Sequence, residues 1–114
     1  MKISNDIEAF SNANISIYQY IKRLKIEREF TGGFATKYNL TLILTALKGE
    51  DALDLKASFF DVMEIKIGNI SDMHCSFLAI DDISSWQWEG VSYQITDSEN
   101  DAFSFKCAKF EILF

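Results

Sequence analysis

Three carboxylates lie at alternate positions in the stretch TDSENDAF. Asp97, Glu99 and Asp101 match positions 1, 3 and 5 of a calcium-binding loop, where the ion takes oxygen ligands. Such a loop also needs a glycine at position 6 for its sharp turn and a glutamate at position 12. Both of these positions hold alanine here, so we predict no metal site in this stretch.

The residues on either side of these acids predict a β-hairpin. VSYQIT before them and FSFKC after them alternate apolar and polar residues, and Ser98-Glu99-Asn100 are turn formers. Charges at a hairpin turn stay in water, so we expect all three carboxylates to be solvated. Such an exposed acidic turn is also a candidate contact for a basic partner.

No other residues have the spacing of a catalytic centre. His74 is the only histidine, and its neighbour Cys75 would point to the opposite face of an extended strand. The second cysteine, Cys107, is too far along the chain to form a CxxC pair. P-loop, GxGxxG, GxSxG and HExxH motifs are absent from the sequence. We therefore predict a protein that is not an enzyme and that has no cofactor.

Two tryptophans and three acids gather in the segment DDISSWQWEGVSY. Asp81 and Asp82 end a predicted strand, and Trp86, Trp88 and Glu89 follow them. One interpretation places both indoles in the core. The other leaves one indole exposed beside the carboxylates, where it could anchor a cationic protein surface. These five residues and the three acids of the hairpin turn are our candidate partner-binding residues.

The chain has the length and apolar content of a single domain, residues 1–114, because 48% of its residues are hydrophobic. No apolar run approaches the roughly 20 residues that span a bilayer. The N-terminus lacks the apolar segment of a signal peptide. We expect a cytoplasmic protein with free thiols and no membrane partner.

Charge is distributed unevenly along the chain. Residues 1–48 carry seven Lys/Arg and four Asp/Glu, a net +3, whereas residues 49–114 carry four Lys and thirteen Asp/Glu, a net −9. The total of −6 disfavours nucleic acid and anionic lipid as partners and favours cationic proteins. The same acidity could serve solubility alone, and charge by itself does not decide between the two.

The first residues predict a short helix. Asn5 and Glu8 have the spacing of a capping box, and Ile3, Ile7 and Phe10 share one helical face. After Asn14 the segment ISIYQYI fits either a strand or a continued helix, and we expect a helix of one to three turns followed by a change of structure.

Alternation with a period of two dominates from residue 24 onward and predicts strands. Gly32 and Gly33 predict a turn after the first of them, which has Leu24, Ile26 and Phe30 on one face. NLTLILTALK is apolar on both faces and should be a central, covered strand. The strand segments are RLKIEREF, NLTLILTALK, DLKASFFDVMEIKIG, HCSFLAIDDIS, VSYQITD and AFSFKCAKFEILF. We predict a mainly β fold, α+β at the margin, whose six or seven antiparallel strands curl into a barrel or sandwich.

Two of these segments require an irregularity. DLKASFFDVMEIKIG is too long for an ordinary strand, so we place a bulge or tight turn near Phe60-Asp61. In the last segment the apolar residues change parity near Ala108-Lys109, which requires a bulge or cover on both faces.

Residues 79–114 resemble a pattern found in small bacterial β-rich proteins. The elements D-I-S, W-E-G, Y-x-I-x-D-x-E-x-D, F-S-F-x-C and F-E-I follow one another in this third of the chain. The proteins concerned are immunity factors of polymorphic toxin and contact-dependent growth inhibition systems. The resemblance implies an inhibitor that binds one cognate toxin domain, often a nuclease with a basic cleft, and that has no catalytic residues.

Our leading hypothesis is therefore an immunity-type protein, a monomer or weak dimer, that blocks a basic toxin domain by steric and electrostatic occlusion. The alternative is a small β-barrel that binds an apolar ligand. Ten Phe, two Trp and four Tyr could line a cavity, although they could equally pack a closed core.

Overall fold

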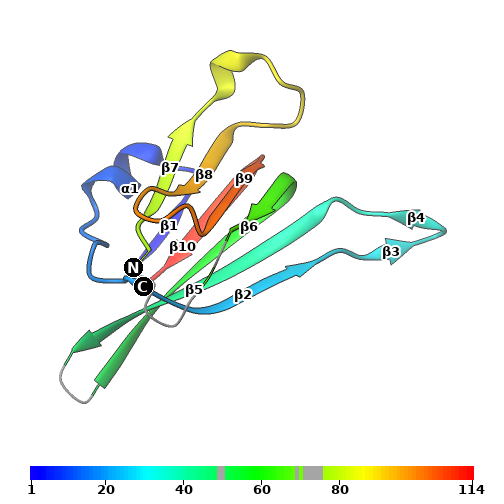
Figure 1. Ribbon diagram of the computed structural model, residues 1–114. Helices are drawn as coiled ribbons and strands as arrows, with labels where there is room; N and C mark the ends of the chain where they lie inside the picture. The colour runs from blue at the N-terminus through cyan, green and yellow to red at the C-terminus, as the bar shows by residue number, and fades with distance from the viewer. Residues whose placement is uncertain (49–50, 69, 71–75) are drawn as a thin grey trace.

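The computed structural model describes residues 1–48, 51–68, 70 and 76–114, and β-strands dominate it (Figure 1). One short helix and one 3₁₀ turn accompany them: α1 (Ile7–Asn12) and η1 (Ser84–Trp86). The strands of the main antiparallel sheet are β1 (Lys2–Ser4), β2 (Tyr20–Glu27), β5 (Tyr38–Lys48), β6 (Asp51–Ile67), β7 (Leu78–Asp82), β8 (Tyr93–Asp97), β9 (Phe103–Cys107) and β10 (Lys109–Leu113). A separate hairpin contains β3 (Phe30–Thr31) and β4 (Phe34–Ala35).

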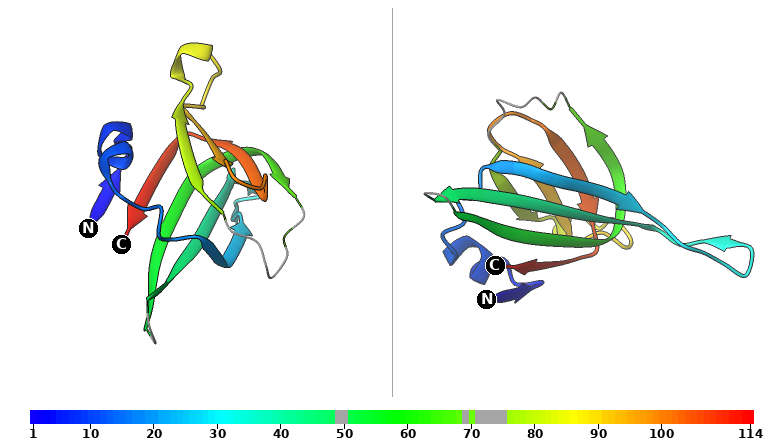
Figure 2. Two further views of the ribbon diagram at one scale, coloured as in Figure 1. Left: turned by 60° about the vertical axis from the view of Figure 1, so that its left-hand side comes forward. Right: turned by 90° about the horizontal axis from the view of Figure 1, so that it is seen from below.

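The long strand β6 joins the two parts of the main sheet. It pairs with β5 along one edge, and along the other edge with β10 in its first half and β9 in its second. The sheet continues from β10 to β1 in one direction and from β9 to β8 and β7 in the other. Because β6 bends, the sheet curls into a half-barrel (Figure 2).

Both predicted irregularities are confirmed. Asp61 and Glu64 have positive φ, and the pairing of β6 shifts register near each of them. In the last segment β9 and β10 are separate strands, and the N–H of Ala108 between them donates to the carbonyl of Phe60 at 3.0 Å. This break turns apolar residues of both parities into the core.

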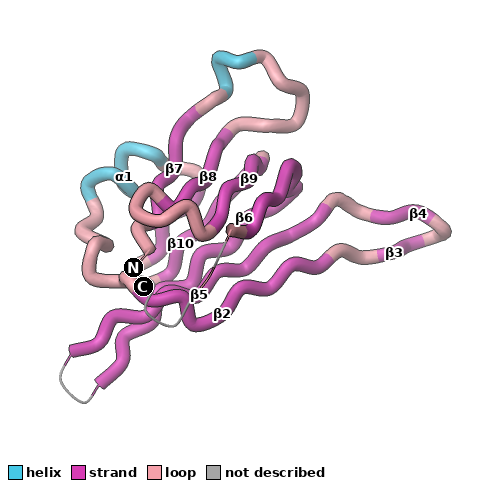
Figure 3. The backbone as a smooth tube through the Cα atoms, in the orientation of Figure 1, coloured by secondary structure: helices cyan, strands magenta, loops and turns pink. Residues whose placement is uncertain are grey.

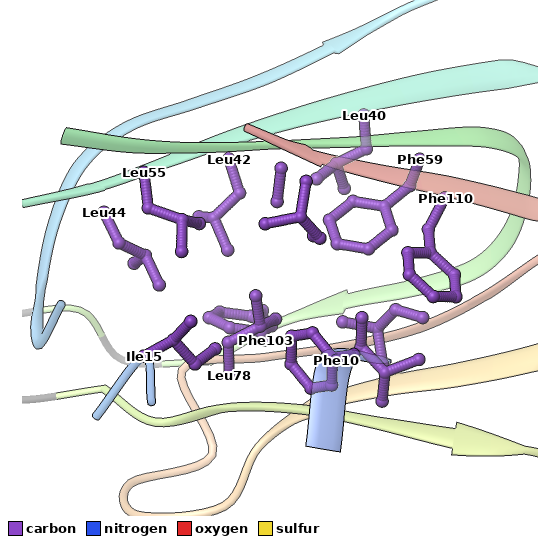
Figure 4. Close-up of a cluster of buried hydrophobic side chains, with 14 of the residues drawn as sticks. Phe10, Ile15, Leu40, Leu42, Leu44, Leu55, Phe59, Leu78, Phe103 and Phe110 are labelled. Atoms are coloured by element: carbon purple, nitrogen blue, oxygen red, sulfur yellow. The ribbon is translucent and has the colours of Figure 1, made fainter. Parts of the chain in front are cut away.

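The core lies inside the half-barrel, and Figure 4 shows side chains from β5 and β6 facing those from α1, β7 and β9. Phe59 and Phe105 pack edge to face with ring centroids 4.9 Å apart, and Phe10 packs in the same way on Phe110 at 6.3 Å. Burying each such ring stabilises the fold by roughly 1.5–3 kcal/mol. The buried phenylalanines thus pack against one another and fill the interior.

The predicted N-terminal capping box is wrong. The helix cap is Asp6, whose carboxylate accepts the N–H of Ala9 at 2.9 Å. Asn5 instead has positive φ and accepts the N–H of Phe110 at 2.7 Å. Ile3 does not belong to the helix, because it lies in β1, where it pairs with Ile112.

Strand β5 is central, as predicted, but only one of its faces is fully covered. Leu40, Leu42 and Leu44 are buried, whereas Ile43 on the other face is half-buried and Leu47 is 69% exposed. The second face is therefore an outer surface of the half-barrel.

Residues 28–37 form an arm that projects from the body of the protein (Figure 1). Gly32 and Gly33 both have positive φ, as a two-residue hairpin turn requires, so the predicted turn is confirmed. Phe30 was expected on the same strand face as Leu24 and Ile26, but it lies on the arm, where it is 71% exposed and Phe34 is 79% exposed.

The predicted fold class, a mainly β protein with a curled antiparallel sheet, is confirmed, although the main sheet has eight strands among the described residues and six or seven were predicted. One strand that was not predicted is β1, because its three residues are too few to show the alternation of apolar and polar residues. His74 and Cys75 lie outside the described residues. Within the described part of the chain, no helix has both the length and the apolar character needed to cross a membrane.

Candidate functional site

The predicted site residues fall into two groups at opposite ends of the β7–β8 ribbon. Asp82 pairs with Tyr93 at one end, and Leu78 pairs with Asp97 at the other. Five residues of extended strand span about 17 Å. The structure therefore brings Asp81, Asp82, Trp86, Trp88 and Glu89 to one end, and Asp97, Glu99 and Asp101 to the other.

Residues 83–92, called here the tryptophan loop, connect β7 to β8 and contain the turn η1 (Figure 3). Ile83 and Val91 are buried and fix the two ends of the loop. Asp82 orders the first turn, because its Oδ1 accepts both the hydroxyl of Ser84 at 2.7 Å and its N–H at 2.9 Å. The same two hydrogen bonds lower the pKa of Asp82, so this carboxylate is ionised at neutral pH.

Both tryptophans lie on the surface of this loop, which rules out the interpretation with both indoles in the core. Trp86 is 51% exposed and Trp88 is 44% exposed. Their rings pack edge to face with centroids 6.4 Å apart, so each restricts the other. Asp81 and Glu89 are also exposed.

Lys106 contacts the tryptophan loop and is itself paired with Glu64. Neither residue was selected from the sequence as part of the site. Lys106 Nζ lies 5.0 Å from the centroid of the Trp88 ring and 2.6 Å from Glu64 Oε2. Its side chain is only 14% exposed. The alternation in FSFKC indicates that Lys106 faces away from the core, but no sequence signal places Trp88 above it. This cation–π contact holds Trp88 against the outer face of β9.

A second lysine borders the same loop. Gly90 has a φ of +75°, and a Cβ at this position would lie 3.0 Å from Lys37 Nζ. The positive φ is what favours glycine at residue 90, since the flexible Lys37 side chain, which follows β4, could move away from a Cβ.

At the opposite end of the ribbon, the hairpin tip, residues 98–101, differs from the prediction in one respect. The hairpin itself is confirmed, and Glu99 and Asp101 are exposed. Asp97, however, is completely buried, so the expectation of three solvated carboxylates is wrong. Its oxygens accept backbone N–H groups from Phe77, Glu99, Asn100 and Ala102. Burial alone would raise the pKa of Asp97, but the four donors together lower it.

The tryptophan loop combines exposed aromatic rings with exposed acidic residues within it or next to it in the sequence. Trp86 and Trp88 are each about half exposed, Asp81, Asp82 and Glu89 in the same segment are exposed, and tryptophan is enriched among the residues that dominate the energetics of protein interfaces. Among residues 1–48, 51–68, 70 and 76–114, no group of three or more His, Cys, Asp or Glu side chains could hold a metal ion.

Comparison with known proteins gives one result. Neither the curated proteins nor the solved structures contain a match to this chain. A family model described as Immunity protein PIM8 matches residues 2–113, which is nearly the whole sequence. The chain therefore belongs to the PIM8 family of immunity proteins.

Proposed function

We propose that this protein neutralises one cognate toxin by covering its active surface, and that the tryptophan loop is the main point of contact. The observation that carries this proposal is the Trp86–Trp88 pair, two interacting indoles that are each about half exposed. Membership of an immunity protein family supports the general role, since such a protein implies a toxin partner.

Pre-organisation favours this loop as an anchor. Binding normally costs about 0.5–1.5 kcal/mol for each flexible side chain that becomes fixed. Here the edge-to-face contact and the Lys106 ammonium already hold Trp88, and the Asp82 carboxylate already orders the turn that carries Trp86. Little of that ordering cost remains when a partner covers the two rings.

The charges around the loop favour a basic toxin. Asp81, Asp82 and Glu89 are exposed in the segment that carries the two indoles, and residues 49–114 as a whole carry a net −9. Complementary charge speeds the encounter and excludes wrong partners. A nuclease domain, whose cleft must be basic to bind nucleic acid, fits this description. Inhibition by occlusion needs no catalytic group on the inhibitor.

The test is co-expression with the product of the gene immediately upstream of this one. We expect the two proteins to co-purify, and the host to stop growing when this chain is omitted. Trp86→Ala should weaken the complex about thirtyfold in calorimetry, as truncation of a central tryptophan commonly does. Phe34→Ala is the matched control, because Phe34 is an even more exposed aromatic residue on the separate arm.

The outcomes separate the role from the site. A complex that Trp86→Ala leaves unchanged would overturn the tryptophan loop as the anchor. Loss of binding in Phe34→Ala alone would move the site to the arm. Absence of both toxicity and co-purification would contradict the proposed function itself with this partner. In every case circular dichroism should show that the variants keep the wild-type fold.

A second variant tests the electrostatic part of the proposal. Asp81→Asn combined with Glu89→Gln removes two exposed charges and keeps the side-chain shapes. We expect slower association with the toxin and a weaker dependence of that rate on salt, with little change in dissociation. An unchanged association rate would show that these two carboxylates do not steer the partner.

A further inference from the structure

Among the described residues, no strand pairs with the second edge of β2, although just before the strand the Gln19 carbonyl accepts the N–H of Ser76 at 2.7 Å. The strand pairing of β2 within the described part of the chain is with β5 alone. An open edge presents unpaired backbone N–H and C=O groups to another strand, and proteins usually protect such edges with charges. The charged residues of β2 are arranged so that they could also favour pairing with a second copy of the strand.

Four charged residues share the outer face of β2 and its extension into the arm: Arg23, Lys25, Glu27 and Glu29. All four are exposed, and Lys25 Nζ lies 3.4 Å from Glu27 Oε2, which places these two side chains on the same face. Two positive charges are thus followed by two negative charges, with Ile26 between the two pairs.

We propose that β2 pairs with β2 of a second copy of this chain, antiparallel and centred on Ile26. In this register Lys25 lies opposite the partner's Glu27, and Arg23 lies opposite the partner's Glu29. The twofold axis repeats both contacts, so all four cross-strand pairs on this face have opposite charges. Pairing of like charges would have prevented association, and the observed order avoids it.

The backbone of the arm supports the same register. The Glu29 N–H donates to Thr36 Oγ1 at 2.8 Å, and the Glu29 carbonyl accepts the N–H of Thr36 at 2.8 Å. Glu29 therefore turns its backbone groups inward, away from the open edge. If this alternation continues back into β2, residues 24 and 26 turn theirs toward the open edge, and the proposed pairing uses this orientation.

This alternation matches a pair centred on residue 26. Ile26 and the partner's Ile26 would exchange two hydrogen bonds at the axis. The charged residues then occupy the non-hydrogen-bonded positions, where Cα atoms are only about 4.5 Å apart and side chains interact most closely. A register centred on Lys25 or on Glu27 would also pair the outward-facing backbone groups, but it would place that residue opposite its own like charge at the axis.

The other face of β2 adds an apolar contact. Ile26 is 38% exposed at the open edge, and a second Ile26 at the axis would cover it. The neighbouring Arg28 is already held over the rings of Phe30 and Tyr38, at 5.0 and 4.6 Å from their centroids. Its guanidinium group is thereby kept beside the arm and does not occupy the axis.

Sedimentation equilibrium of the purified full-length protein over a range of concentrations tests the proposal. We expect a reversible monomer–dimer equilibrium that weakens as salt is added. Glu27→Lys places Lys25 opposite a lysine at both symmetry-related positions and should raise the dimer dissociation constant by about tenfold or more. Glu8→Lys is the matched control, because it makes the same charge change at an exposed residue of α1.

The decisive variant exchanges the two charges. Lys25→Glu combined with Glu27→Lys restores opposite charges across the axis, so it should recover the wild-type dissociation constant. A protein that is monomeric at every concentration would overturn the proposal. So would a Glu27→Lys variant that dimerises like the wild type, or a double variant that does not recover. None of these results bears on toxin binding, which is assigned to other residues.

Discussion

The Asp97 carboxylate fixes the start of β9: its Oδ2 accepts the N–H of Ala102 at 3.1 Å, across the whole hairpin tip. Its Oδ1 accepts the N–H groups of Phe77, Glu99 and Asn100 at 3.0, 3.1 and 3.4 Å. One buried side chain thus satisfies backbone donors from the turn and from the residue before β7. Asp97 therefore stabilises the hairpin and is not available at the surface. Among the acids of this hairpin, only Glu99 and Asp101 remain as predicted partner contacts.

Asp97→Asn should therefore lower the free energy of unfolding by about 1–3 kcal/mol, because an amide NH₂ would face a backbone N–H that now has an acceptor. Urea denaturation followed by tryptophan fluorescence gives this value. The control is Glu99→Gln, whose side chain is exposed and which should change stability by less than about 0.5 kcal/mol. Equal stabilities of the two variants would contradict the structural role of Asp97.

The same carboxylate should make stability depend on pH in the acid range. The pKa of Asp97 is lowered in the folded protein, whereas an unfolded chain has a value of about 3.9. Its contribution is therefore fully present above about pH 4 and is lost as pH falls through the lower folded value. We expect the stability difference between the wild type and Asp97→Asn to shrink as the pH of the urea titrations decreases from 5 to 2. A constant difference would show that ionisation of Asp97 does not matter.

Much of the fold could be predicted because alternation along a strand reports which face is buried. The β8–β9 hairpin and the change of parity at Ala108 followed from it, whereas the bulge at Asp61 followed from the unusual length of that strand segment. The arm was harder to predict, since Phe30 continues the apolar parity of Leu24 and Ile26 but lies beyond the point where the core ends. Alternation contains no information about where the core stops.

The site was predicted only in part, for a different physical reason. Trp86, Trp88 and the acids near them could be selected by residue type, but their separation from the hairpin tip depends on the pairing of β7 with β8. The contact between Lys106 and Trp88 depends on how a ten-residue loop folds back over a neighbouring strand. The burial of Asp97 could not be foreseen. An aspartate beside a turn can point into water or can accept hydrogen bonds from the backbone of the turn, and the sequence looks the same in both cases.

The buried thiol of Cys107 should be inert in the native protein. Burial raises its pKa to about 12, so almost no thiolate is present at pH 8. In a Cys75→Ser background, an aromatic disulfide reagent should label Cys107 only at the rate of unfolding, and fully in urea. Rapid labelling under native conditions would contradict the burial of this residue in β9.

Gly68 should not tolerate a side chain. A Cβ at this position would lie 2.4 Å from the backbone oxygen of Asp101, and the Gly68 N–H donates to the carbonyl of Ala102 at 2.9 Å. Gly68→Ala should cost about 1–3 kcal/mol of stability in thermal or urea unfolding, because the two backbones must separate. Gly33→Ala is the control: its Cβ would meet no atom, so only the cost of positive φ remains, about 1 kcal/mol.

Strand β6 has a further consequence for how the protein folds. It is held on one edge by its sequence neighbour β5, but on the other by β10 and β9, which are synthesised much later. The two parts of the sheet are therefore joined by pairing between residues distant in sequence, and folding on the millisecond-to-second scale is expected. Once formed, β6 can open only if both halves of the half-barrel open together, so its amides should exchange with solvent last of all.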